Sequence, residues 1–391
     1  MNFYDRALAL QNETSAHRRY FHRNAEVGLD LPKTRDYVMQ QLRSIGLEPR
    51  LCGHGITATL GNGGKCILLR ADMDALPMPE NSGETFACPT GTENHACGHD
   101  LHAAMLLTAA KLLKEREAEL KGTVKLMFQP AEETFEGAYD MVANGILEDP
   151  KPDAAMAYHV GAGKAGPGFF SYNNTSATLF SVDGFRVLIH GKGAHGAFPQ
   201  ESVDPINIAV HVYLAMQTII SREVDPQKAC IMTVGSFNAG TANNIIPNEA
   251  VLSGTIRCND QPSREKMKRR LEEMARKTAE VYGGTARVEW VSQVPPLVCA
   301  PSVVNDMVRY MGELEIPGMQ GANGAVATAS EDFAVISSRI PASFMYLTAG
   351  FPDADNPAPA HNPKVRFNEG VLPIGAACFA QCAVRWLEDH M

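Results

Sequence analysis

Residues 94–102 read Asn-His-Ala-Cys-Gly-His-Asp-Leu-His, and they place one thiol and three imidazoles where a loop is expected to enter a helix. Cys97 and His99 are one residue apart, so both can turn toward a single point. A thiolate and an imidazole are ligands that a borderline-soft divalent ion prefers. Glu132 and Glu133 follow later, and one carboxylate can bind a metal while its neighbour moves a proton. The stretch therefore predicts a metal centre with an acid–base group beside it.

Each of these residues also has a structural interpretation. Nine cysteines in a chain without a secretory signal are mostly buried thiols, and adjacent glutamates are usually solvated. His102, three residues after His99 on the expected helix, can equally support the site or belong to the core. The position of the residues relative to the strands decides between these interpretations.

Four apolar runs are expected to be core strands, and each one leads to an acid or a histidine. They are 65–70 before Asp72 and Asp74, 124–129 before Glu132 and Glu133, 154–158 before His159, and 342–347 before the loop that carries His361. Open α/β sheets gather their functional loops at the carboxyl ends of the strands. The pattern favours an α/β fold whose strand ends converge on a metal site.

The composition is that of an ordinary globular enzyme. The 391 residues are enough for two domains, and 45% hydrophobic with 20% charged residues is usual. A net charge of −9 argues against a nucleic-acid partner. No run approaches the ~18 apolar residues of a membrane span, and the irregularly spaced cysteines indicate reduced thiols. We expect a cytoplasmic protein with a small-molecule partner and without nucleic-acid or membrane partners.

The order of the elements indicates that a small module interrupts a larger one. Residues 1–180 alternate helices and strands, with helices expected over 34–45 and 99–119. Residues 181–293 read β-α-β-β-α-β, the order of a ferredoxin-like split unit. Its strands are expected over 185–189, 230–237, 250–258 and 286–291, and its helices over 204–220 and 262–282. Residues 294–391 resume the first pattern, so the predicted domains are 1–180 with 294–391, and the inserted 181–293.

Eight motifs are spread over nearly the whole chain. They are Arg70-Ala-Asp-Met-Asp-Ala-Leu-Pro77, His95-Ala-Cys-Gly-His-Asp100, Gln129-Pro-Ala-Glu-Glu133, His159-Val160, Gly191-Lys-Gly-Ala-His195, Asn244-Ile-Ile-Pro247, Ser330-Glu-Asp-Phe333 and His361-Asn362. In this order they resemble the co-catalytic metallo-aminoacylase and carboxypeptidase family. The resemblance is to its branch of hippurate hydrolases and plant auxin-conjugate (indoleacetyl-amino-acid) hydrolases. The set is specific, although no single motif is.

The resemblance implies a mixed-sheet, zinc-exopeptidase-like catalytic domain with an inserted lid or dimerisation domain. It implies two divalent ions per subunit. Glu132 would be the general base that serves the attacking water and the leaving amine. Asp74 matches the acid that holds a ligand in place in related branches, where a histidine stands at the position of Asp72. The implied ligands are Cys97 as the bridging or shared one, with His99, Glu133, His159 and His361.

The identity of the ions is open from the sequence. A thiolate favours zinc, whereas imidazoles and a carboxylate also suit manganese, cobalt or nickel. We expect zinc or manganese, with cobalt or nickel as alternatives.

Three residues of the inserted module are candidate substrate contacts. His195 lies in a glycine-rich turn, where its structural interpretation is a surface histidine. The resemblance implies that it reaches a neighbouring subunit's site and steadies the oxyanion. Asn244 and Arg257 are natural donors to a substrate carboxylate or carbonyl. A homodimer, or a higher homo-oligomer, is therefore expected through the inserted module.

The resemblance implies an amidohydrolase that releases amino acids from hippurate-like or N-acetyl-amino acid substrates. A dipeptidase or carboxypeptidase of the same fold is an alternative, because it also cleaves an amide next to a free carboxylate. An N-acyl-diaminopimelate deacylase is another. A non-catalytic metal-binding scaffold is disfavoured by the intact Glu132 and the full ligand set. Departures from the family pattern at Ala25-Glu26, Gln200 and 160–167 leave the acyl group open.

Overall fold

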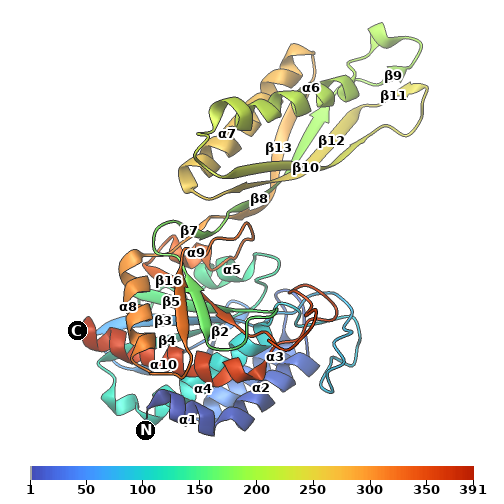
Figure 1. Ribbon diagram of the computed structural model, residues 1–391. Coiled ribbons are helices and arrows are strands. Elements are labelled where there is room, and N and C mark those ends of the chain that lie inside the picture. The colour runs from blue at the N-terminus through green and yellow to red at the C-terminus, as the bar shows by residue number, and fades with distance from the viewer. Residues whose placement is uncertain (1) are drawn as a thin grey trace. The chain divides into compact units, whose positions relative to one another are not determined.

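The computed structural model describes residues 2–391, which pack as two units (Figure 1). The first unit runs to Thr178 and resumes over Val298–Val326 and Asp332–Met391. The second unit comprises Leu179–Leu297 and Ala327–Glu331. A role of the second unit as a lid or dimerisation domain stays a prediction.

The first unit is built on an eight-stranded sheet with the order β1-β2-β4-β3-β5-β16-β6-β15. Its centre consists of parallel neighbours, and their almost complete burial is typical of strands covered on both faces. These central strands are β4 (Gly122–Gln129), β3 (Lys65–Asp72), β5 (Ala154–Gly161) and β16 (Ala342–Thr348). They contain the four apolar runs that the sequence predicts as strands, although β5 continues past His159.

The outer strands make the sheet mixed, as predicted. β1 pairs antiparallel with β2, and β2 with β4, while β6 pairs antiparallel with β16 and parallel with β15. Their bounds are β1 (Arg50–Cys52), β2 (Gly55–Gly61), β6 (Phe169–Tyr172) and β15 (Gln320–Asn323). The predicted α/β fold class is confirmed.

Two long helices, α4 (His99–Glu115) and α10 (Leu372–Asp389), pack against each other and against β3. Alanine and leucine dominate α4, which favours a helix, and 14 of its 17 residues are buried, so it is a core element. The helix ends at Glu115, earlier than predicted, and a 3-10 turn, η1 (Glu117–Glu119), follows. Shorter helices complete the unit: α1 (Phe3–Ala9), α2 (Gln11–Arg23), α3 (Pro32–Ser44), α5 (Gly137–Ala143), α8 (Pro301–Gly312) and α9 (Ala334–Ser337).

One apolar helical region of the first unit contains no unbroken run of ~18 apolar residues, because Gln381 and Arg385 interrupt it. The helical region Glu369–Asp389 is long and apolar enough to cross a membrane by length and composition. However, 83% of its apolar window is buried inside the structure. This burial is the pattern of a core helix, which explains the apolar composition without a membrane.

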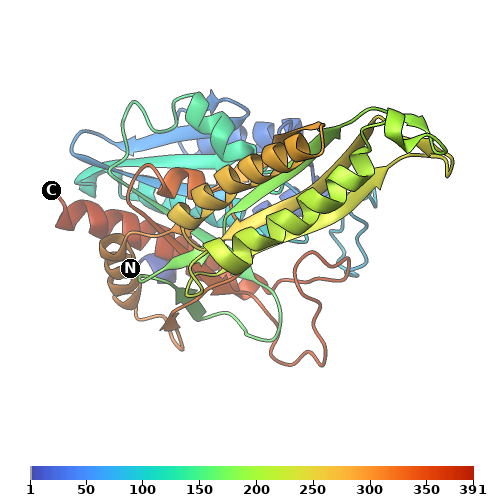
Figure 2. The ribbon, with the colours of Figure 1, turned by 90° about the horizontal axis from the view of Figure 1, so that it is seen from above.

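The second unit has the predicted order β-α-β-β-α-β. Its sheet runs β10-β12-β8-β13 with every pair antiparallel, which is the ferredoxin-like arrangement. Figure 2 shows both of its helices side by side. The elements are β8 (Val182–His190), α6 (Pro205–Thr218), β10 (Cys230–Ala239), β12 (Glu249–Cys258), α7 (Gln261–Val281) and β13 (Thr285–Val294).

Local sequence signals set the helix starts in this unit. The Asp204 side chain accepts a hydrogen bond from the N–H of Ile206, and the Asp260 side chain accepts one from Ser263. Both are N-caps, and each is followed by a proline in the first turn, where its missing N–H costs nothing. At its C-terminal end, α6 passes into a short π-helical turn over Ile219–Glu223.

Two short ribbons complete the strand pairing. In the second unit, β9 (Ala194–His195) pairs with β11 (Ile245–Ile246). β7 (Ala177–Leu179) pairs with β14 (Leu297–Val298), where the chain enters and leaves this unit.

Candidate metal centre

Residues at the carboxyl ends of the parallel strands converge with the start of α4. Asp72 ends β3, His159 lies near the end of β5, and Gly98 precedes α4. Gly98 has φ of +91°, and a Cβ there would lie 2.4 Å from Val160 Cγ2. Only glycine fits this turn, which presents Cys97 on one side and the helix residue His99 on the other.

Cys97 belongs to two groups of three donor atoms. The donors of Cys97, His99 and His159 lie within 4.8 Å of one another, and so do those of Cys97, Glu133 and His361. Cys97 Sγ is 3.3 Å from Nε2 of His159 and also 3.3 Å from Nε2 of His361. His361 Nε2 is 3.4 Å from Glu133 Oε1. The fold thus brings all five predicted ligands together as two groups that share one sulfur.

The donor set fits divalent ions. Within residues 2–391, His99 Nε2 and Glu133 Oε1 are buried and have no hydrogen-bond partner. Leaving such an atom unpaired costs about 1–3 kcal/mol, so buried orphans in a native structure indicate a partner such as an ion. Sulfur, imidazole nitrogen and carboxylate oxygen are together the donors that borderline-soft divalent ions take.

The histidine tautomers are set by backbone carbonyls. His99 Nδ1 donates to the Asp74 carbonyl oxygen at 2.9 Å, and His159 Nδ1 donates to the Val160 carbonyl oxygen at 2.8 Å. A carbonyl oxygen only accepts, so in each ring the proton is on Nδ1. The lone pair of each Nε2 therefore faces the cluster, as a metal-binding imidazole requires.

Asp74 supports the glutamate pair. Its two carboxylate oxygens accept the backbone N–H groups of Glu132 at 3.0 Å and Glu133 at 3.1 Å. The turn that carries Glu132 and Glu133 has a strained backbone, because Ala131 and Phe135 on either side have φ of +53° and +61°, values that residues other than glycine rarely adopt. Asp74 therefore orients both glutamates through the backbone, and its own carbonyl orients His99.

We expect Asp74→Asn to lower kcat about 10- to 100-fold, the usual effect of losing a partner that orients metal ligands. The asparagine amide can accept only one of the two N–H groups, because its nitrogen opposes the other. The measurement is kcat together with metal content per subunit. Asp30→Asn, at an exposed position, is the control. An Asp74→Asn enzyme with unchanged kcat would contradict the orienting role.

Asp72 and His102 form a support behind the cluster. The Asp72 carboxylate accepts hydrogen bonds from Arg70 at 2.7 Å and from His102 Nδ1 at 2.5 Å. His102 Nε2 in turn accepts the N–H of Val160 at 2.8 Å, next to His159. Both nitrogens of His102 are thus engaged, so the structure resolves its role as a supporting residue. Donor atoms of Asp72, His99 and His102 also lie close enough to hold an ion. However, Asp72 and His102 are hydrogen-bonded to each other, so these atoms already have partners.

A buried hydrogen-bond network lies beside Asp72, and its role was not predicted from the sequence. Arg70 also donates to Gln129 Oε1 and to Asp332 Oδ1, each at 3.0 Å, and Gln129 donates to Asp332. Arg70, Gln129 and Asp332 are fully buried. The available signal was an arginine and a glutamine at the ends of otherwise apolar strands, since charges are buried only when paired.

Burial and neighbouring charges act in opposite directions on the pKa values of the cluster. Burial raises the pKa of the Cys97 thiol to about 12 and lowers the pKa of His159 to about 3. Burial opposes ionisation of Asp72 too, but Arg70 and the nearby imidazoles outweigh it and hold the pKa of that carboxyl well below its usual range. A coordinating divalent ion would deprotonate the thiol outright, so the ligand form of Cys97 is linked to metal binding.

The candidate substrate residues of the second unit fall at two places. His195 pairs with Ile245 in the β9–β11 ribbon, and the Asn244 carbonyl accepts the N–H of Gly196 at 2.8 Å. His195 and Asn244 are therefore neighbours, and both are exposed. β12 begins at Glu249, shortly after β11 ends at Ile246, so His195 and Asn244 lie near the start of β12.

Arg257 lies near the other end of β12, roughly 25 Å from Glu249 along the strand. It donates to the Thr328 carbonyl oxygen at 3.2 Å and to Ser330 Oγ at 2.9 Å. The second unit does not bring Arg257 together with His195 and Asn244.

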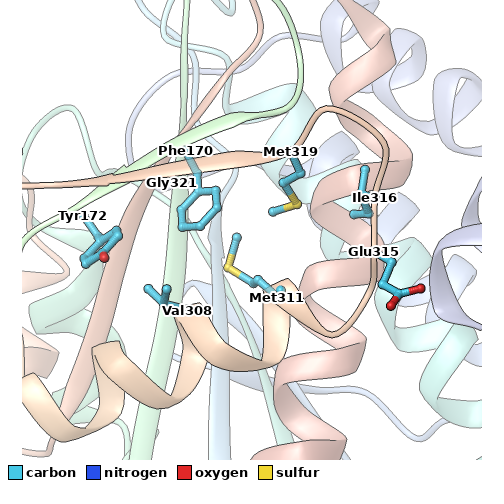
Figure 3. Close-up of a pocket in the computed structure, with 9 residues that line it drawn as sticks. Phe170, Tyr172, Val308, Met311, Glu315, Ile316, Met319 and Gly321 are labelled. Atoms are coloured by element: carbon cyan, nitrogen blue, oxygen red, sulfur yellow. The ribbon is translucent and has the colours of Figure 1, made fainter.

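A separate cavity in the first unit contains none of the candidate ligands. It has a volume of about 300 Å³ and lies between α8, β6 and β15. Phe170 and Met311 face each other across it (Figure 3). A Cβ on Gly321 would lie 2.3 Å from the Phe170 ring, so the glycine makes room for the aromatic side chain. The cavity has a mixed lining that includes Glu315 and Tyr172, and it adds no group to the metal centre.

The chain is similar to known proteins along almost its whole length. A profile for "Peptidase family M20/M25/M40" matches residues 68–385. N-acetyl-L-cysteine deacetylase of Bacillus subtilis (strain 168) is 36% identical over 389 residues, which cover 97% of this chain and 90% of that protein. IAA-amino acid hydrolase ILR1-like 4 of Arabidopsis thaliana is 35% identical over 379 residues, covering 95% and 84%. The solved structure of YXEP from Bacillus subtilis, a dinuclear metal binding peptidase of the M20 family, matches with a TM-score of 0.81 at 27% identity, covering 97% and 99%.

Proposed function

Because the chain belongs to peptidase family M20/M25/M40 and is a hydrolase of amide bonds, we propose that it cleaves N-acyl-amino acids to a carboxylic acid and a free amino acid. One observation carries the proposal. Two groups of donor atoms share Cys97, and the pair Glu132–Glu133 is held against them by Asp74. This arrangement would provide a metal centre with a carboxylate beside it, the combination that metal-dependent amide hydrolysis uses.

We assign two divalent ions to the two groups, with zinc or manganese ahead of cobalt or nickel. His99 and His159 would hold one ion, Glu133 and His361 the other, and Cys97 would be shared. Bound there, the ions would polarise the substrate carbonyl and lower the pKa of water toward ~7.

Glu132 is the proposed general base. It is 5% exposed, and its Oε2 lies 3.9 Å from His99 Nε2, within reach of the cluster. Its backbone is fixed by Asp74, so the carboxylate is held near the place where water would attack. Glu132 takes the proton of the attacking water on a carboxylate oxygen and then delivers it to the leaving nitrogen. The one residue thus serves both halves of the reaction.

We propose that the enzyme acts as a homodimer, or a higher homo-oligomer, through the second unit. Asn244 and Arg257 would bind the substrate carboxylate or carbonyl, and His195 would steady the oxyanion from a neighbouring copy. Asn244 lies beside His195 and far from Arg257 along β12, so one copy of the second unit does not present Asn244 and Arg257 to the same substrate, which supports a contribution from a second copy. A cytoplasmic location remains part of the proposal.

We expect His195→Ala to lower kcat about 10²- to 10³-fold, the range found for loss of an oxyanion donor. Bound metal should stay unchanged, because His195 lies in the other unit from every candidate ligand. His190→Ala, a half-exposed histidine on β8, is the matched control.

Mixing inactive His195→Ala protein with inactive Glu132→Gln protein tests whether the histidine acts across subunits. Recovered activity in mixed oligomers supports action in trans. No recovery, with subunit exchange verified, would confine His195 to its own chain.

The proposed function is tested by release of amino acid from N-acetyl-amino acids, N-benzoyl-amino acids and unblocked dipeptides, each with metal added and with metal chelated. We expect metal-dependent release from the N-acyl substrates, with dipeptides much slower. Faster release from dipeptides would identify a dipeptidase instead. Hydrolysis that is unaffected by chelation would contradict the metal-dependent mechanism.

A further inference from the structure

Two cysteines of the second unit lie directly opposite each other on neighbouring antiparallel strands. Cys230 begins β10, Cys258 ends β12, and the register pairs them. The Asn259 N–H donates to the Ala229 carbonyl oxygen at 3.1 Å, one residue outside the pair. The N–H and carbonyl of Cys258 instead bond to Ser181 on its other side. Cys230 and Cys258 are therefore a non-hydrogen-bonded pair.

This kind of pair brings the two side chains closest. The Cα atoms of a non-hydrogen-bonded antiparallel pair are about 4.5 Å apart, inside the range of about 4.4–6.8 Å that a disulfide spans. Both side chains leave the same face of the sheet, because residues directly opposite each other point the same way. No backbone movement is needed to join the two thiols.

We propose that Cys230 and Cys258 are a modification site, at which a low-molecular-weight disulfide converts the two thiols into a reversible cross-strand disulfide. All nine cysteines are free thiols in the structure. Seven are buried, and Cys97 and Cys230 are the two that are partly exposed. Since Cys97 belongs to the candidate metal centre, Cys230 is the thiol that a reagent in solution can reach.

The surroundings of the two cysteines determine which thiol reacts first. Hydrogen bonds from Cys258 and Ser263 lower the pKa of Cys230, whereas the hydrogen bond with Cys230 and burial raise the pKa of Cys258. Cys230 is thus the thiolate that attacks first, and attack by a thiolate is how disulfide exchange proceeds. Cys258 is fully buried, with its Sγ 3.5 Å from Met267 Sδ, so external reagents do not reach it directly.

The exchange balances in two steps. The Cys230 thiolate attacks one sulfur of the external disulfide, which forms a mixed disulfide and releases one thiolate. Cys258 then attacks the Cys230 sulfur and expels the second thiolate, which takes up the Cys258 proton. The protein loses two electrons and two protons in all, and the external disulfide is reduced to two thiols. A reducing thiol reverses both steps.

The test uses the full-length, metal-loaded enzyme and oxidised glutathione, with peptide mapping by mass spectrometry. We expect a Cys230–Cys258 linked peptide, loss of two titratable thiols per chain, and full reversal by dithiothreitol. Cys258→Ala should stop at a glutathione adduct on Cys230, and Cys230→Ser should give neither product. Cys378 and Cys382, buried one turn apart on α10, are the internal control and should stay reduced.

Three results would overturn the proposal. One is a wild-type protein that keeps both thiols under conditions that oxidise a solvent-exposed dithiol. Another is a glutathione adduct on wild-type Cys230 that never proceeds to the linked peptide. The third is a linked peptide that forms only after urea has unfolded the protein, because the native register would then not be what joins the two thiols. Circular dichroism of both variants establishes that they are folded.

Discussion

Glu132→Gln is expected to keep its bound metal and to lose about 10²- to 10⁴-fold in kcat, the range that a positioned acid–base group contributes. Glutamine has nearly the same size and shape, and the Glu132 backbone N–H that Asp74 accepts is untouched by the substitution. What disappears is the carboxylate that takes the proton from water and returns it to the leaving nitrogen. The loss should therefore fall on turnover, with metal content intact.

The measurement is kcat on an N-acyl-amino acid together with metal per subunit by plasma mass spectrometry. Glu136→Gln is the matched control, since Glu136 lies on the same turn but is exposed. If the Glu132→Gln enzyme turned over at near the wild-type rate, the base would have to be another acid. Asp74 would be the first to test, because it lies against the same turn.

Cys97→Ala is expected to abolish binding of both ions, whereas His361→Ala should abolish only one. The reason is the sharing of donors: Cys97 belongs to both groups of three, and His361 belongs to one. Metal stoichiometry after dialysis should therefore fall toward zero in the first variant and by about half in the second. Cys66→Ala, at a buried thiol elsewhere in the same sheet, is the control. Equal stoichiometry in the Cys97 and His361 variants would contradict a shared sulfur.

The same sulfur should report the state of the site to alkylating reagents. Metal should mask Cys97 from iodoacetamide, because a coordinated thiolate is no longer a free nucleophile. Chelation should expose it, and because burial raises the pKa of the metal-free thiol to about 12, the labelling should be done at alkaline pH. Alkylation of the chelated protein should then prevent reactivation by added metal. Equal labelling of Cys97 with and without metal would count against its being a ligand.

The sequence predicted the central strands correctly for physical reasons, whereas the family was predicted from the resemblance of the eight motifs. Parallel strands buried on both faces must be apolar runs, and the loops at their carboxyl ends must carry the polar residues of a site. The order of helices and strands in the second unit could also be predicted, because Asp204 and Asp260, each followed by a proline, mark the starts of its two helices.

Other features depend on contacts between distant parts of the chain, which no local pattern encodes. The Arg70–Gln129–Asp332 network joins three segments and has no spacing signal. His102 was ambiguous from the sequence because its partners, Asp72 and the Val160 N–H, come from two different strands. The burial of α10 could not be predicted from its composition, because a core helix and a membrane helix can share one composition.

The division of the chain has a consequence for how such enzymes diversify. Every candidate ligand, and Glu132, belongs to the first unit, whereas His195, Asn244 and Arg257 belong to the second. Under the proposed roles, mutations in the two sets would affect different properties, the first set metal binding and the second set substrate recognition. Most of the second unit is the continuous segment Leu179–Leu297, whose ends pair as β7 and β14, and Ala327–Glu331 joins it from later in the chain. Exchange of this segment would change the proposed substrate contacts and leave every candidate ligand in place.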